Sequence, residues 1–234
     1  MTTAANITYF PANLKATAIL DVHSGEVRRL AQTLRQLGQS DREFAQKAHL
    51  CLCRTVRPIY TVDEWQPASQ TLRKKKGSCS QRMACLEALA RAAGIPTRVL
   101  ALRVKGSFWY PRFQLSRPFI PRSVLLVWPQ FLLDRAWVDF DELHAPMAQL
   151  AEGSPGFRNK GESLFEAVRK TPVDFLGKTC GLGCSKPGHD LSKYVLSNEG
   201  LFDTRDEVFE RFGSFQHTPR GRLFEIVFGG RESS

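Results

Sequence analysis

The segment from residue 77 to residue 98, GSCSQRMACLEALARAAGIPTR, limits the possible folds of this chain more than any other part. Its residues from Cys79 to Ala93 favour a helix, with apolar side chains and the thiol on one face. Gly94-Ile95-Pro96 ends this helix, because glycine adopts the left-handed conformation that follows helices and proline cannot continue one. The alternating segment from Arg98 to Lys105 then predicts a strand. A sharply bounded helix therefore begins at a cysteine and leads into a sheet.

Cys79 is the candidate nucleophile of the chain. Lys74-Lys75-Lys76 precede it, and both nearby cations and a helix N-terminus favour the reactive thiolate form of cysteine. The backbone N–H at such a helix start is also a natural donor to an oxyanion. Gln81 and Arg82 lie in the first turn, where they either contact a substrate or form a solvated helix end.

Helices come first in this sequence and strands follow. Helices are predicted for residues 24–37 and 40–54, and strands for residues 98–105, 123–128 and 136–140. Such an order is typical of an α+β domain, with the cysteine helix packed on an antiparallel sheet. We divide the chain into an N-terminal helical segment (1–54), a core (55–205) and a C-terminal extension packed on the core (206–234).

The composition is that of a soluble globular protein. The chain has 234 residues, of which 42% are hydrophobic and 24% are charged. It contains neither an apolar run of about 18 residues, as a membrane span would need, nor the pattern of a signal peptide. Six cysteines are too few for a disulfide scaffold in a chain of this length. We therefore expect a cytoplasmic protein without a membrane partner.

The net charge of +10 raises the question of nucleic-acid binding. Most Lys and Arg residues are scattered, however, and the only tight basic run is residues 73–76. The sequence has no zinc-finger spacing, no RNA-binding strand motif and no basic tail. We therefore expect no specific nucleic-acid partner. A basic surface around Lys74 to Lys76 suits an acidic partner, such as an acyl-carrier-type protein.

Three segments together resemble the bacterial transglutaminase-like superfamily. They are Gly77-Ser78-Cys79, Gly94-Ile95-Pro96-Thr97-Arg98 and Trp137-Val138-Asp139-Phe140-Asp141. The resemblance covers roughly residues 55–205 and is strongest over 71–141. It implies a papain-like core with a Cys-His-Asp site, in which Cys79 attacks an acyl carbon and Asp141 orients the histidine.

The histidine of this family is the residue that the sequence lacks. The family places it about eleven residues before the tryptophan, which here is Leu126, and residues 124–128 contain no histidine. His144 and His189 are substitute bases, although each is also explained as a surface histidine. Because water needs a general base more than an amine does, loss of the histidine favours acyl transfer over hydrolysis.

Aromatic residues are the remaining candidates for substrate contacts. Residues 108–113, FWYPRF, either line an apolar acyl pocket through Trp109 or pack a loop onto the sheet. Trp128 lies on the strand that would carry the histidine. Upstream of the cysteine, Trp65 or Gln70 is a candidate for a second oxyanion donor.

A zinc site is the alternative interpretation of the late cysteines. Cys180, Cys184 and His189 would provide three ligands, but the spacing differs from the usual CxxC and no fourth ligand is nearby. We therefore expect reduced cysteines and neither a metal nor another cofactor.

The preferred function is cysteine-dependent acyl transfer, with amide or thioester chemistry, through a thioester at Cys79. Its substrate would be a peptide or an acyl-carrier-type protein. One alternative is a catalytically inactive member of the family that binds a peptide or protein partner. The other is a leader-peptide cysteine protease of the kind that accompanies lasso peptides, whose motif Cys79-x-x-Arg82 resembles.

Overall fold

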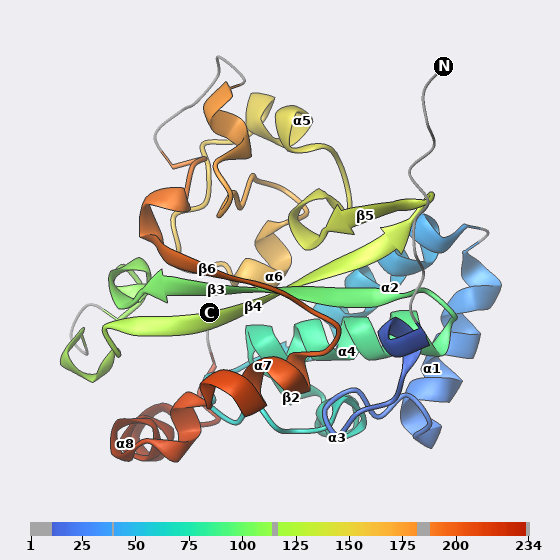
Figure 1. The fold of residues 1–234 in the computed structure, drawn as a ribbon, viewed down its shortest axis with the longest axis horizontal. Coiled ribbons are helices and arrows are strands. Elements are labelled where there is room, and N and C mark those ends of the chain that lie inside the picture. Colours follow the sequence, from blue (N-terminus) through green and yellow to red (C-terminus); the bar gives the residue numbers. More distant parts are fainter. Residues whose placement is uncertain (1–10, 39, 114–116, 182–187, 233–234) are drawn as a thin grey trace.

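A four-stranded antiparallel sheet forms the centre of the computed structural model, which describes residues 11–38, 40–113, 117–181 and 188–232 (Figure 1). The strands are β3 (Thr97–Lys105), β4 (Ser123–Leu133), β5 (Ala136–Asp139) and β6 (Val195–Phe202). They lie in the order β5-β4-β3-β6. In this register Leu126 of β4 pairs with Leu102 of β3, and Gln130 pairs with Asp139 of β5. The predicted α+β architecture is confirmed.

Three of these strands agree with those expected from the sequence, although β4 extends five residues further, to Leu133, than predicted. Asp134 and Arg135 form the turn after it, both with positive φ. The edge strand β6 was not predicted from periodicity. Its side chains do not alternate between buried and exposed, since Leu196 and Leu201 are both about half exposed (52% and 50%). An exposed edge strand leaves little hydrophobic pattern in the sequence.

Three of the helices before the sheet begin at side-chain caps. They are α1 (Gly25–Leu37), α2 (Asp41–Thr55) and α4 (Cys79–Ala92). Ser24 caps α1, while Ser40 and Ser78 each form a capping box with the residue three positions later. Gly94, with φ of +83°, follows the last turn of α4 as predicted.

The segment between α2 and α4 is more ordered than the loop that its prolines indicate. It contains the helix α3 (Ala68–Lys74) and the two-residue strands β1 (Arg57–Pro58) and β2 (Lys76–Gly77), which pair in parallel. Pro67 occupies the N-cap position of α3, where a proline is compatible with the helix that follows. Despite Pro58 and Pro67, this segment is therefore not a continuous loop.

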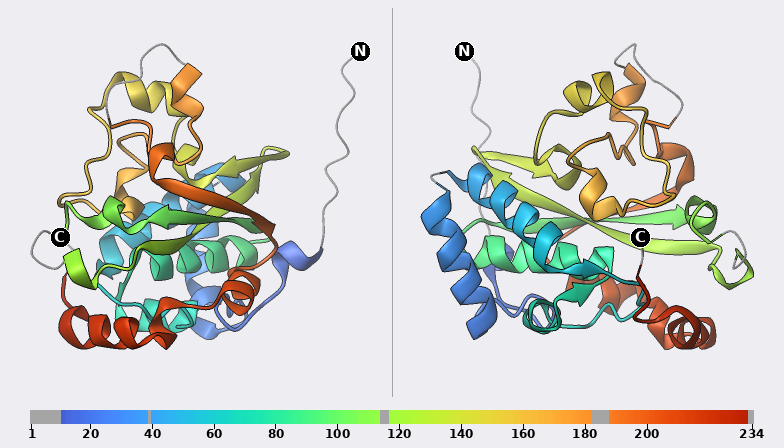
Figure 2. Two further views of the ribbon diagram at one scale, coloured as in Figure 1. Left: turned by 60° about the vertical axis from the view of Figure 1, so that its left-hand side comes forward. Right: turned by 180° about the vertical axis from the view of Figure 1, so that it is seen from behind.

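Helix α4 lies in the interior of the fold, between the sheet and the outer helices (Figures 1 and 2). Every residue from Gln81 to Arg91 is buried, so this helix has no solvated face over that length. Two of its buried charges are paired, since Arg82 contacts Glu166 and Glu87 contacts Arg205, while Arg91 donates to backbone carbonyls and to Thr97. The cysteine helix is thus fixed in position from all sides.

The C-terminal part of the chain returns to the start of α4. It contains α7 (Arg205–Phe212) and α8 (Pro219–Phe228), after the short helices α5 (Met147–Glu152) and α6 (Leu164–Ala167). Tyr60 exchanges backbone hydrogen bonds with this segment, accepting from Gly230 and donating to Arg231. Glu225 accepts from Thr61 Oγ1 and from the backbone N–H of Val62.

These contacts pack the end of the described chain against residues 59–62. The division of the chain into three parts, with boundaries at residues 54/55 and 205/206, stays a prediction. Within the described ranges, no helix has both the length and the hydropathy that a membrane span requires.

Candidate active site

Cys79 is the first residue of α4, and local packing fixes its position. Ser78 Oγ accepts a hydrogen bond from the backbone N–H of Gln81, and the Gln81 side chain accepts from the N–H of Ser78. Gly77 leaves no room for a side chain, since a Cβ there would lie 2.8 Å from Thr71 Cγ2 and 3.1 Å from Gln81 Oε1. The close approach of α3 to the start of α4 therefore depends on this glycine.

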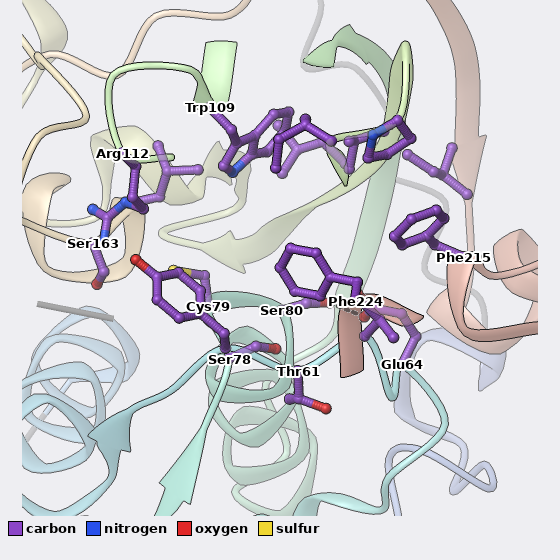
Figure 3. A pocket seen from close by; sticks show the side chains of 18 of the residues that line it. Thr61, Glu64, Ser78, Cys79, Ser80, Trp109, Arg112, Ser163, Phe215 and Phe224 are labelled. Carbon is purple, nitrogen blue, oxygen red and sulfur yellow. Dashed lines mark hydrogen bonds between the residues drawn. The ribbon is translucent and has the colours of Figure 1, made fainter. Parts of the chain in front are cut away.

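The thiol of Cys79 lies in the wall of a cavity of about 200 Å³ (Figure 3). The side chain is half-buried. Strand β4 provides one part of the wall, which includes Leu126, and the segment after β1 provides another. Phe215 and Phe224 of the C-terminal segment also line the cavity, which stays partly open to solvent. Residues far apart in the sequence therefore form a space large enough for part of a small substrate.

The polar groups of this cavity are few. Only Glu64 and Arg112 are charged among the described residues that line it. Figure 3 shows Arg112 and Ser163 at the same end of the cavity as Cys79, and Phe215 toward the other end. Glu64 lies on the side of Phe224 and Phe215, so each end of the cavity has one charged residue in an otherwise largely apolar wall.

Arg112 is held in the wall by acceptors on a single loop. Its Nε donates to Asn159 Oδ1 at 3.1 Å, and its guanidinium also donates to the backbone carbonyl of Glu162. Asn159 is buried in a left-handed conformation, and its Nδ2 donates to the carbonyl of Phe108 at 2.7 Å. Sequence reasoning missed Arg112 although it lies in the FWYPRF segment, and no motif in the sequence indicates Asn159.

Glu64 belongs to a network behind the thiol. The hydroxyl of Ser80, the residue after Cys79, donates to the Glu64 carboxyl. Burial raises the pKa of Glu64 above its usual value. Arg205 donates to Ser80 Oγ at 3.1 Å and to the Ser80 carbonyl at 3.3 Å. This network links the first turn of α4 to α7.

Asp141 lies outside the described cavity wall and is buried beside a lysine. Lys178 Nζ is 3.7 Å from Asp141 Oδ1, and it donates to Asp139 Oδ2 at 2.6 Å and Glu142 Oε2 at 2.8 Å. Burial raises the pKa of Asp141 to about 8. The three carboxylates are close enough to share a metal ion, but the Lys178 ammonium already provides the positive charge among them. The geometry supports an ion-pair cluster.

His144 pairs with another histidine and does not line the cavity. Its Nε2 lies 2.8 Å from His49 Nδ1, and His49 Nε2 lies 2.6 Å from the carbonyl of Phe165. Because a carbonyl only accepts, His49 Nε2 carries the proton and His49 Nδ1 accepts from His144. Burial lowers the pKa of His144 to about 4 and that of His49 to about 3, so both are neutral near pH 7.

His189 is fully buried, so its interpretation as a surface histidine is wrong. Its Nε2 lies 2.7 Å from the carbonyl of Ser154. Gly156 and Gly188 approach closely there, since a Cβ on Gly156 would lie 2.5 Å from the Gly188 carbonyl carbon. The side chains of Cys180 and Cys184 lie outside the described residues, so the zinc alternative is not examined by the structure.

Of the predicted substrate contacts, Trp109 lines the cavity, whereas Trp65, Trp128, Gln81 and Arg82 do not. Trp128 is buried against aromatic rings. Gln81 Nε2 donates to the carbonyl of residue 63, and Arg82 donates to residue 163. Both Gln81 and Arg82 are buried, which excludes the solvated helix end.

The fold and site define an α+β protein that presents a cysteine at the start of a buried helix, against an antiparallel sheet. Residues 28–142, which include Cys79, Leu126 and Asp141, match the sequence model of the transglutaminase-like superfamily. The chain belongs to this superfamily.

A solved structure of a candidate protease from Parabacteroides distasonis is similar, with 17% sequence identity and a TM-score of 0.38. The similarity covers 70% of this chain and 32% of that one, so this chain corresponds to about a third of that protein. No curated protein sequence matches.

Proposed function

We propose that this protein is a cysteine-dependent acyl transferase that forms a thioester at Cys79 and acts on amides or thioesters. The observation that carries the proposal is the position of the thiol, in the wall of a 200 Å³ cavity at the first turn of α4. A nucleophile for acyl transfer needs both this access and donors for the oxyanion. The acyl group would come from a peptide or an acyl-carrier-type protein.

The first step joins Cys79 Sγ to the acyl carbon. The bond from that carbon to the leaving sulfur or nitrogen breaks, and the proton of the thiol passes to the leaving group. The backbone N–H groups of Cys79 and Ser80 are in the first turn of α4, where no carbonyl within the helix can accept from them. Such groups suit an oxyanion on the carbonyl, because they lie at the positive end of the helix dipole.

Leu126 in the cavity wall, where the family would place a histidine, favours transfer to an amine over hydrolysis. No imidazole is present among the described residues of the wall. An amine attacks the thioester as a nucleophile and loses its own proton to the departing thiolate. Water is a poorer nucleophile and depends more on a positioned base, which contributes about 10²–10⁴ in rate.

A catalytically inactive protein that binds a peptide or protein partner is the second candidate. The contact of Asp141 with Lys178 favours it, since this carboxyl is engaged with a lysine where the family uses a histidine. A leader-peptide protease is the third candidate, and it requires efficient attack by water. The three functions differ in whether Cys79 reacts and in what then removes the acyl group.

Selective alkylation of Cys79 separates these functions. Burial raises the pKa of Cys53 to about 11 and that of Cys85 to about 12, so neither thiol competes near pH 7. Cys51 is half-buried and is the matched competitor.

With one equivalent of iodoacetamide at pH 7, we expect peptide mapping to find Cys79 modified faster than a free peptide thiol. The Cys51→Ser variant should keep that rate and Cys79→Ala should lose it. Modification no faster than the peptide thiol would favour the inactive protein and overturn the proposal. An acyl-Cys79 that water removes as fast as 10 mM glycinamide does would favour the protease.

A further inference from the structure

We propose that the cavity beside Cys79 holds the hydrocarbon part of an acyl group of about six to eight carbons. The acyl donor is then a medium-chain or aryl-alkanoyl thioester. The inference rests on the proposed function and specifies its substrate class. It is carried by the shape and chemistry of the cavity wall.

Most of the cavity wall is apolar and is built from separate segments, with Glu64 as the charged residue on the side of Phe224 and Phe215. Phe113, Ile120 and Phe224 form a small hydrophobic cluster of their own, and all three line the cavity. Val62 and Phe215 pack on the same cluster and line the cavity as well. A polar group on an acyl chain bound next to this cluster would lose its hydrogen bonds to water without replacement. The wall therefore selects hydrocarbon over polar acyl groups.

The volume of the cavity sets the length of the chain. An apolar cavity of about 150 Å³ accepts one benzene molecule. The present cavity, of about 200 Å³, is about one third larger. It therefore has room for about two carbons beyond a six-carbon ring. Acetyl leaves most of this space empty, and chains of twelve carbons exceed it.

The residues at the two ends of the cavity set the direction of the chain. Cys79, Ser163 and Arg112 lie at one end, where the thioester carbonyl forms (Figure 3). Phe215 lies toward the other end, where the last carbons of the chain would lie. The carbonyl would thus lie beside Arg112 and Ser163, and the last carbons beside the rings of Phe215 and Phe224.

The reaction on such a donor is a thioester exchange. The bond from Cys79 Sγ to the acyl carbon forms, the bond from that carbon to the donor sulfur breaks, and the thiol proton passes to that sulfur. An amine then takes the acyl group and gives its proton back to Cys79. No oxidation or reduction takes place.

The test uses N-acetylcysteamine thioesters with acyl chains of two to twelve carbons. These uncharged donors remove any effect of the basic surface. Acyl-Cys79 is measured by intact mass and peptide mapping, and each rate is divided by the rate of glutathione with the same donor. Burial of each added methylene should raise the normalised rate about fourfold, up to six to eight carbons. Beyond that length the rate should fall.

The outcomes separate this inference from the proposed function. A normalised rate that does not depend on chain length would overturn the acyl pocket and leave Cys79 as a nucleophile. Absence of acylation with every donor, together with unselective alkylation of Cys79, would overturn the proposed function itself.

Substitutions at Phe215 give a second test. Phe215→Ala lengthens the apolar end and should move the optimum to chains about two carbons longer. Phe215→Trp fills it and should move the optimum to shorter chains. Phe212→Ala is the matched control, since Phe212 is an equally half-buried phenylalanine that packs on Phe202 and does not line the cavity. Unchanged optima in both Phe215 variants would overturn the inference.

Discussion

Arg205 is the residue whose replacement we expect to destabilise the protein most strongly next to the site. Its side chain is 1% exposed, and that of its partner Glu87 is not exposed at all. Arg205 Nε donates to Glu87 Oε1 at 3.0 Å, and the same guanidinium donates to the hydroxyl and carbonyl of Ser80. Arg205→Met keeps most of the volume and removes every one of these bonds.

The expected loss follows from the charge that the substitution leaves behind. Without Arg205, the Glu87 carboxylate is buried with no cation bonded to it, and breaking such a pair costs about 3–5 kcal/mol. In a chain of 234 residues, each kcal/mol lowers the melting temperature by about 2–4 °C. Arg205→Met should therefore melt roughly 6–20 °C below the unchanged protein.

The loss should also depend on pH. Burial already raises the pKa of Glu87 above the usual 4.5, and removing the arginine raises it further. The folded variant then keeps a proton on Glu87 that the unfolded chain releases, so its stability falls as the pH rises above 4.5. The deficit of Arg205→Met should be smaller at pH 5 than at pH 8.

Urea denaturation followed by tryptophan fluorescence measures these effects. Arg211→Met is the control on the same helix, since this arginine is exposed, and it should change stability by no more than about 1 kcal/mol. The double variant Glu87→Leu/Arg205→Met should recover much of the loss, because no buried charge remains. A loss below about 1 kcal/mol in Arg205→Met, without recovery in the double variant, would refute the reasoning.

Three further substitutions test other parts of the site. Ser78→Ala should cost about 1 kcal/mol, as should Ser40→Ala on α2, but only Ser78→Ala should change the alkylation rate of Cys79 in mass spectrometry. Asp141 keeps its proton when folded between pH 3.8 and about 8, so native stability should fall with rising pH across that window. In urea denaturation at pH 5 and pH 8, Asp141→Asn should lose less unfolding free energy between the two pH values than the unchanged protein does. An equal loss in the two proteins would contradict the raised pKa. Leu126→His should speed hydrolysis of acyl-Cys79 by about 10², as measured by intact mass, and an unchanged rate would contradict the inference that residue 126 is the position for a general base.

Local signals in the sequence were sufficient for the elements that present the cysteine. Ser78 and Gly94 mark the two ends of α4, and counting back from Trp137 selected Leu126, which does line the cavity with Cys79. The helix ends depend on neighbours in sequence, and the choice of Leu126 depends on the spacing that the family resemblance implies. They are therefore visible without a structure.

The rest of the cavity was not predictable, because it arises from tertiary packing. Asn159 and Phe215 reach the wall from segments that carry no motif. Trp65 and Trp128 are aromatic residues close in sequence to site elements, yet Trp128 packs in the core and neither lines the cavity. Nearness in sequence to the nucleophile indicates little about which side chains surround it.

The state of Asp141 decides how far the family mechanism can apply to this site. An aspartate that orients a histidine acts as a carboxylate and stabilises the imidazolium that forms. Here burial raises the pKa of Asp141 to about 8, and the nearest cation, Lys178 Nζ, is 3.7 Å away. At neutral pH this carboxyl is mostly protonated, so it offers little stabilisation to an imidazolium.

A new histidine at residue 126 would consequently lack the partner that makes a triad efficient. The rate gain expected from Leu126→His is therefore at the low end of the range for a general base, about 10². Without a triad, an oxyanion site and substrate binding alone still accelerate acyl chemistry by about 10³–10⁴ over water. That acceleration is enough for a thiol that exchanges thioesters with an amine acceptor, and too little for an efficient amide hydrolase. This comparison supports the proposed acyl transfer over the alternative of proteolysis.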